Sequence, residues 1–233
     1  MALIEAYVTN LGKYNEGELS TELLKFPTTK EEVQAALKHI GVDNIQYAEI
    51  FIPAYDGDLP GLYANLGEYE SIDELNYLSC LLFELDQGDL EKFEAVIDSG
   101  EHTSSVADLI NLAQNLDCYE LYPDIENEED LGRYCLEDLD IPDALRDYFD
   151  YEAYGRDVLI EGEGHFAPGG YIVQTSGDFK EFYHDTKDIP AEHKVFAFPQ
   201  LSVREQMAAY KEVIDRFPQA TERRPPTKEH DDR

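Results

Sequence analysis

The chain has 233 residues, and its 51 acidic and 18 basic side chains give a formal net charge of −33 at pH 7. Hydrophobic residues make up 42% of the sequence and aromatic residues 12%, which is too apolar for a disordered acidic tail. The composition therefore predicts a folded, very acidic protein. It argues against direct binding to nucleic acid or to an anionic membrane, because both ligands require clustered Lys and Arg side chains.

Targeting and cysteine signals favour a cytoplasmic protein. No run approaches eighteen apolar residues, so no membrane span is expected. The N-terminal residues 1–6 lack the basic region and long apolar core of a signal peptide. Cys80, Cys118 and Cys135 are odd in number and widely spaced, which predicts reduced core thiols rather than disulfides or a zinc site.

The acidic residues are concentrated in one part of the chain. Residues 51–150 hold 27 acidic and 3 basic side chains, whereas residues 201–233 hold seven of each. Adaptation to high salt would spread acids over every surface, and solvated helix faces normally mix both signs. Repulsion among these like charges destabilises a compact chain. We therefore infer that the electric field of the acidic region serves the function of the molecule. Duplex DNA carries one charge per roughly 1.7 Å, so a net 24 charges match roughly 40 Å of duplex. A protein with a basic groove could therefore bind this region in place of DNA. Calcium binding is the alternative use of so many carboxylates.

The first unit, residues 1–60, reads as a small α/β domain. An apolar run over 4–8 predicts a strand. A capping box over 28–32 opens a helix that ends at Gly41. Residues 45–52 alternate and then run apolar, which predicts a second strand.

Residues 61–104 read as an acidic domain of short helices. Ser71 and Glu74 form a second predicted capping box, followed by an amphipathic stripe of apolar residues up to Leu85. A further helix is predicted from Asp89 to Gly100.

Residues 105–178 read as an α+β domain. Ser105 caps a predicted helix. The acids of residues 126–130 precede a second predicted helix that begins at Leu131, and negative charge is favourable at a helix N-terminus. Residues 158–160 and 171–173 are predicted strands, and Pro142 to Leu145 a short helix. Residues 179–217 form an extension whose helix is capped by Ser202, and residues 218–233 a disordered tail by composition. The predicted fold is an elongated α+β chain of three small domains with a C-terminal helical extension.

No enzyme signature stands out, and we expect no catalytic residue, metal or cofactor. The chain has no Gly-rich phosphate loop, no Gly-x-Ser-x-Gly elbow and no histidine pair at metal-binding spacing. Residues 124–135 alternate somewhat like a calcium loop. They carry Glu129 in place of the required sixth-position Gly and Cys135 in place of the twelfth-position Glu. A hydrolase that uses a carboxylate pair remains a remote alternative.

Five ordered blocks of sequence point to a family. They are Leu11–Leu19, Leu66–Asn76, Asp108–Tyr119 with Leu121–Pro123, Glu129–Tyr134, and Tyr148–Asp157, followed by Tyr171–Ile172 and Ser176–Asp178. Over roughly residues 3 to 178 the chain resembles the ArdA family of antirestriction proteins.

This resemblance implies a function, a partner and site residues. ArdA proteins imitate bent B-form DNA and occupy the DNA-binding groove of type I restriction-modification enzymes, which protects mobile genetic elements. They are elongated homodimers of three small domains per chain, joined through the third. In this sequence the antirestriction motif and dimer contact would include Leu131, Gly132, Arg133, Tyr134 and Leu139.

The acidic surface expected to replace phosphates comprises Glu68, Glu70, Asp73, Glu74, Asp86, Asp89, Glu94, Asp98, Asp108, Asp117, Glu120, Asp124, Glu126, Glu128, Glu129, Asp130, Glu137 and Asp138. The alternative function is a generic acidic module that sequesters a basic nucleic-acid-binding protein.

Overall fold

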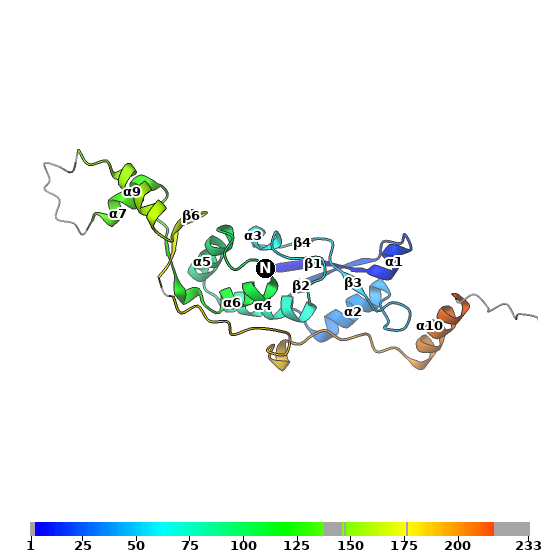
Figure 1. Cartoon of the computed structure of the whole chain (residues 1–233). Coiled ribbons are helices and arrows are strands. Elements are labelled where there is room, and N and C mark those ends of the chain that lie inside the picture. Colours follow the sequence, from blue (N-terminus) through cyan, green and yellow to red (C-terminus); the bar gives the residue numbers. More distant parts are fainter. Residues whose placement is uncertain (1–2, 138–145, 147, 176, 217–233) are drawn as a thin grey trace, which may run out of the picture.

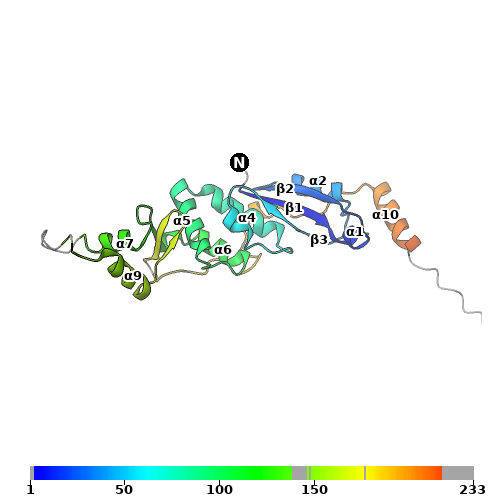
Figure 2. The same cartoon turned by 90° about the horizontal axis from the view of Figure 1, so that it is seen from above.

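The molecule is elongated, with two small antiparallel sheets separated by helices (Figure 1). The computed structural model describes residues 3–137, 146, 148–175 and 177–216. The view from above shows the same extended outline, with α7 and α9 at one end and α10 at the other (Figure 2). The mixed α+β composition predicted from the sequence is confirmed.

The first sheet is built around β1 (Ile4–Asn10). β2 (Thr21–Phe26) pairs antiparallel with it along its length, while the short strands β3 (Ile50–Phe51) and β4 (Tyr55–Asp56) pair with its other side. The short helix α1 (Leu11–Asn15) follows β1 directly. The predicted strand over 4–8 is confirmed.

The predicted strand over 45–52 is mostly wrong, because only its last residues pair with β1. The Asp43 Oδ1 atom accepts hydrogen bonds from the backbone N–H groups of Ile45, Gln46 and Tyr47, at 2.8–3.1 Å. These bonds hold the segment in a turn and compete with strand pairing.

Helix α2 (Lys30–Ile40) has the termini that the sequence predicts. Thr29 Oγ1 accepts from the Glu32 backbone N–H at 3.3 Å, and Glu32 Oε2 accepts from the Thr29 N–H at 2.9 Å. Gly41 ends the helix with a φ of 80°, a conformation that glycine adopts without strain. The capping box is therefore confirmed.

Four helices form the middle of the molecule: α3 (Pro60–Tyr63), α4 (Ile72–Glu84), α5 (Gln87–Asp98) and α6 (Val106–Ala113). Ser105 caps α6 as predicted. α5 begins two residues before the predicted Asp89, because the Asp86 carboxylate accepts from the Asp89 N–H at 2.9 Å and acts as the N-cap.

The predicted capping box at the start of α4 is only half formed. Ser71 Oγ accepts from the Glu74 N–H at 3.5 Å. The Glu74 carboxylate accepts instead from the Tyr183 hydroxyl at 2.6 Å, which draws it toward the C-terminal segment.

The second sheet has the strand order β5–β7–β6, with β5 (Tyr119–Tyr122), β6 (His165–Ala167) and β7 (Gly170–Gln174). The 3-10 turn η1 (Leu116–Cys118) leads into β5. The predicted strand over 171–173 is confirmed. The predicted strand over 158–160 is wrong, because these residues belong to helix α9 (Tyr151–Glu161), which Asp150 caps.

Helix α7 (Glu128–Cys135) packs closely on α9 through two glycines. A Cβ atom on Gly132 would collide with the Tyr151 carbonyl oxygen, and one on Gly155 with the Glu128 carbonyl oxygen. α7 begins three residues before the predicted Leu131, because Asn127 Oδ1 accepts from the Asp130 N–H at 3.0 Å.

After β7 the chain runs back along the helical middle to the first sheet (Figure 1). We call residues 178–198 the C-terminal strap. It contains the 3-10 turn η2 (Ala191–His193) and leads to α10 (Val203–Arg216), which confirms the helix predicted after Ser202. The predicted helix from Pro142 to Leu145 and the predicted tail of residues 218–233 lie outside the described residues.

Two clusters of buried apolar residues support this arrangement. The main cluster runs from Ile4 in β1 through α2 and α4–α6 to Ile172 in β7, and it includes Tyr183 and Val195 of the strap. The smaller cluster centres on Ile125, Leu131 and Tyr171 and lies beneath α7 and α9. The strap is therefore part of the main core.

Candidate functional site: the acidic surface

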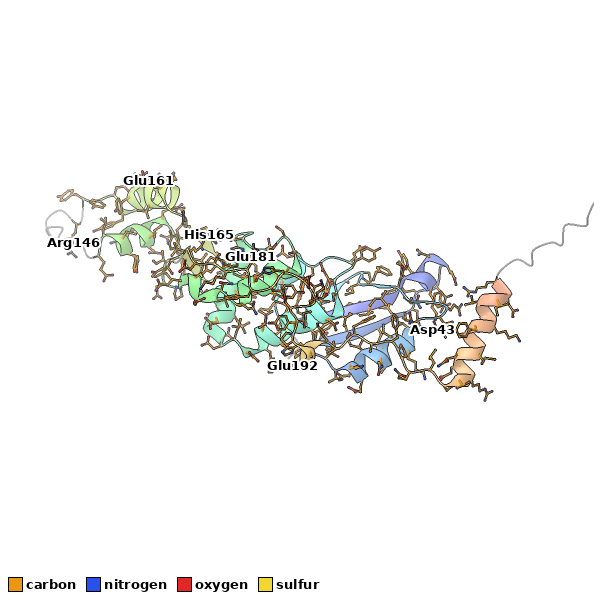
Figure 3. All side chains as sticks on the ribbon, turned by 60° about the horizontal axis from the view of Figure 1, so that its bottom comes forward. Asp43, Arg146, Glu161, His165, Glu181 and Glu192 are labelled. Atoms are coloured by element: carbon orange, nitrogen blue, oxygen red, sulfur yellow. The ribbon has the colours of Figure 1, made fainter. Side chains whose placement is uncertain are left out.

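The acidic residues predicted from the sequence lie at the molecular surface. Every described member of the predicted set is at least partly exposed, while Asp138 lies outside the described residues. Acidic side chains occur along the length of the molecule. Glu161 on α9 stands at one end, and Glu181 and Glu192 follow along the strap (Figure 3). The surface is therefore extended and has no single pocket as its centre.

The helices place these acids in a characteristic way. The first turns of α4, α5, α6, α7 and α9 all carry acids, which the positive end of the helix dipole stabilises. Their last turns would normally carry Lys or Arg. Those of α4, α5, α6 and α9 carry none. Bases within these helices are few: Lys92 pairs with Asp89 on α5, and Arg156 pairs with Glu152 on α9.

One group of the predicted acids has carboxylates that make no side-chain hydrogen bond or ion pair with any described residue. We call them the open carboxylates, and they are Glu68, Glu94, Asp98, Asp108, Asp117, Asp124, Glu126, Glu128 and Glu137. Their oxygen atoms keep their full capacity to accept hydrogen bonds from a partner.

A second group has carboxylates engaged within the chain. Glu70, Asp86 and Asp130 accept backbone or amide hydrogen bonds that close turns and helix ends. Asp89 and Glu129 form ion pairs with Lys92 and Arg133, at 3.2 and 2.6 Å, and Glu120 accepts from the Tyr122 hydroxyl at 2.8 Å. These groups have part of their charge or acceptor capacity satisfied.

Two predicted members face the C-terminal strap. Asp73 Oδ1 accepts from the backbone N–H groups of Val195 and Phe196, at 2.7 Å each, and Glu74 accepts from Tyr183. The sequence grouped both with the phosphate substitutes. The structure places them at an internal contact, so the open carboxylates are the better candidates for that role.

Titration shifts are consistent with a surface whose negative charge resides on carboxylates. Partial burial raises the pKa of Glu94, and repulsion from Glu91 raises it further. Burial also raises the pKa of Tyr119 and Tyr122, and the nearby carboxylates of Glu101 and Glu120 add to the effect. These phenols therefore stay neutral and do not add to the charge.

A comparison with protein families assigns this chain to a family. The family model described as "Antirestriction protein (ArdA)" matches residues 6–173. The chain belongs to the ArdA family of antirestriction proteins. A comparison with curated proteins found no match. The matched region covers nearly all of both sheets and all of the open carboxylates, whereas the strap and α10 lie beyond it.

The segment that resembles the ArdA antirestriction motif has an inner and an outer side. Leu131 and Gly132 are buried against α9 and the second sheet. Arg133 is exposed, and its guanidinium lies 4.4 Å from the centre of the Tyr151 ring. Tyr134 is also exposed, whereas Leu139 lies outside the described residues. Leu131 and Gly132 thus position the exposed pair.

Three exposed acids near α9 are not in the set predicted from the sequence. Asp157, Glu161 and Glu163 are exposed on and after α9. The apolar run over 158–160 predicts a strand, and the predicted acidic set does not extend to this segment. The Asp150 cap was the available signal for a helix there.

Metal ligands, membrane-spanning helices and activated thiols would mark other kinds of site in the described residues. Among them, no group of three or more His, Cys, Asp or Glu side chains is arranged to hold a metal ion. No described helix is long and apolar enough to cross a membrane. The free thiols of Cys80, Cys118 and Cys135 have pKa values raised by burial, so none is an activated nucleophile.

Proposed function

We propose that this chain is an antirestriction protein that imitates B-form DNA and binds in the DNA-binding groove of a type I restriction-modification enzyme. The observation that carries the proposal is the set of exposed open carboxylates on an elongated body whose central helices lack basic last turns. In this mechanism the carboxylates replace phosphates, and Lys and Arg side chains of the target groove pair with them.

Binding would follow the physics of protein–DNA association. Pairing of carboxylates with groove cations releases counterions, so affinity should fall steeply with salt. The long-range field of a chain with net charge −33 should also speed association with a basic groove. The chain acts by occupying a site, without catalysis or a cofactor, and it does so in the cytoplasm.

We further propose three small domains, residues 1–60, 61–104 and 105–178, and a homodimer joined through the third. The α7–α9 end exposes several large apolar side chains that a second copy could cover: Tyr134, Tyr148, Phe149 and Ile160. Of these, Tyr148 is 87% exposed. Tyr is enriched at protein interfaces because its ring buries apolar area while its hydroxyl stays hydrated.

The alternative is a generic polyanion that sequesters basic nucleic-acid-binding proteins. The discriminating experiment titrates the chain against a type I restriction enzyme and, in parallel, against an unrelated basic DNA-binding protein of similar DNA affinity. A DNA mimic fitted to its target should inhibit the restriction enzyme at near-stoichiometric concentration and the other protein only at large excess. Equal inhibition of both would favour the generic polyanion.

A further inference from the structure

The C-terminal strap is bound by side chains that recognise its backbone. Asn115 contacts both backbone groups of Lys180, with Nδ2 donating to its carbonyl and Oδ1 accepting from its N–H, at 2.9 Å each. Asn111 Oδ1 accepts from the N–H groups of Phe182 and Tyr183, at 2.8 and 2.9 Å. Asn111 Nδ2 donates to the Tyr183 carbonyl at 2.8 Å. Both asparagines are buried on or just after α6.

A second set of contacts ties the strap to α4 and to the loop before α2. Asn76 Oδ1 accepts from the Thr28 N–H at 2.8 Å, and its Nδ2 donates to the His193 carbonyl at 3.0 Å. One buried side chain therefore joins the first sheet's connecting loop, α4 and the strap. Asp73 on α4 also accepts hydrogen bonds from the successive backbone N–H groups of Val195 and Phe196.

The strap also contributes to the core and continues to a further anchor. Tyr183, Ile189 and Val195 are almost fully buried, with exposures of 3%, 2% and 5%. Gln34 on α2 donates to the Phe198 carbonyl at 2.9 Å. The strap thus contacts α6 near the second sheet and α2 beside the first.

The end of the segment is held by charge. Glu205 on α10 pairs with Lys38 on α2 at 3.0 Å. Hydrogen bonds from Ser202 and this ion pair lower the pKa of Glu205 to about 2. Arg216 pairs with Glu16, just after α1, at 2.7 Å.

We propose that the C-terminal strap is a tie that fixes the geometry of the acidic body, with Asn111 and Asn115 as its positioning residues. The strap lies outside the ArdA-matched region, yet it bonds to three helices within that region, α2, α4 and α6. A surface that imitates duplex DNA must hold its charges at fixed separations, and a body that flexes loses entropy when it binds. The tie makes the body rigid before binding. Its consequence for inhibition rests on the proposed function, whereas its effect on the body's geometry does not.

The test measures distances within the full chain. Spin labels are placed through unnatural amino acids at the exposed positions 30 on α2 and 156 on α9, so that the native cysteines stay unmodified. The double variant Asn111→Leu/Asn115→Leu should turn a narrow distance distribution into a broad one. It should also weaken inhibition by about tenfold or more, since the bound geometry is no longer preformed.

Two variants sharpen the result. Asn111→Asp keeps the acceptor for two strap N–H groups, but it replaces the donor to the Tyr183 carbonyl with an acceptor, so its distribution should be intermediate. Asn65→Leu removes an amide-to-backbone bond that does not involve the strap, from Asn65 to the Gly61 carbonyl at 3.0 Å, and should match the parent chain. Circular dichroism identifies variants that remain folded.

A folded double variant with the parent's narrow distribution would overturn the tie, whatever its inhibition. If the double variant does not fold, the Asn111→Asp distribution decides: broadening supports the tie and an unchanged distribution overturns it. A parent chain that fails to inhibit the enzyme would refute the proposed function, while the distance distributions would still decide the tie.

Discussion

Removing open carboxylates should weaken target binding far more than removing the same charge elsewhere. The perturbation is the fourfold variant Asp117→Asn, Asp124→Asn, Glu126→Gln and Glu128→Gln, which leaves the net charge at about −29 by simple counting from the sequence. None of the four carboxylates bonds to a described side chain, so folding should survive. The matched control amidates four exposed acids outside residues 51–150, Glu31, Glu49, Glu212 and Asp215, with the same change in charge.

The expected magnitude follows from the exposure of the site. Solvent-exposed ion pairs contribute about 0.2–1 kcal/mol each, so four lost pairs should cost about 1–4 kcal/mol. That cost corresponds to a roughly 5-fold to nearly 10³-fold weaker inhibition constant. If each carboxylate replaces one phosphate, the slope of log affinity against log salt should also become shallower by up to about 0.9 per group.

The assay is inhibition of DNA cleavage by a type I restriction enzyme at several salt concentrations. The control variant should show little loss of affinity and nearly the parental slope. Equal losses in both variants would refute the reasoning, because affinity would then depend on total charge and not on the placement of the carboxylates.

Two further predictions concern the elements that position the surface. Gly132→Ala should destabilise the α7–α9 contact by about 1–3 kcal/mol, because the new Cβ would collide with the Tyr151 carbonyl. Gly61→Ala is the control and should cost less stability, because its Cβ would make only ordinary van der Waals contacts with Ile97. Hydrogen exchange of residues 128–135 checks this, and equal protection in both variants would contradict it. Burial and the Glu74 carboxylate raise the pKa of Tyr183. The stability that depends on the neutral phenol is therefore complete below its unfolded pKa of about 10, and it is lost as the pH rises above that value. Unfolding free energies between pH 8 and 11 should fall in the parent and less in Tyr183→Phe, and parallel curves would contradict the assignment.

Local signals in the sequence predicted much of the secondary structure. The Thr29–Glu32 capping box and Gly41 define both ends of α2, and Ser105 defines the start of α6. Each signal acts within a few residues, so sequence spacing alone reveals it. The concentration of acids between residues 51 and 150 was equally visible, and the described members proved accessible.

Long-range contacts account for the features that the sequence did not predict. Asn115 binds the backbone of Lys180, which is 65 residues away, and a bond to backbone groups leaves no residue pattern at the far end. The same limit applies to Asp73 and Glu74, whose partners on the strap lie more than 100 residues along the chain. The close contact of α9 with α7 requires Gly155, whose neighbour Glu128 is met only in the folded molecule.

The central claim is that the acidic surface and duplex DNA compete for one groove. The most direct measurement is equilibrium displacement of a labelled duplex from a type I restriction enzyme by increasing amounts of this chain. The account predicts full displacement with no complex containing both duplex and chain, and an apparent affinity that falls in proportion to added unlabelled duplex. A ternary complex, or displacement that is insensitive to competing duplex, would contradict it.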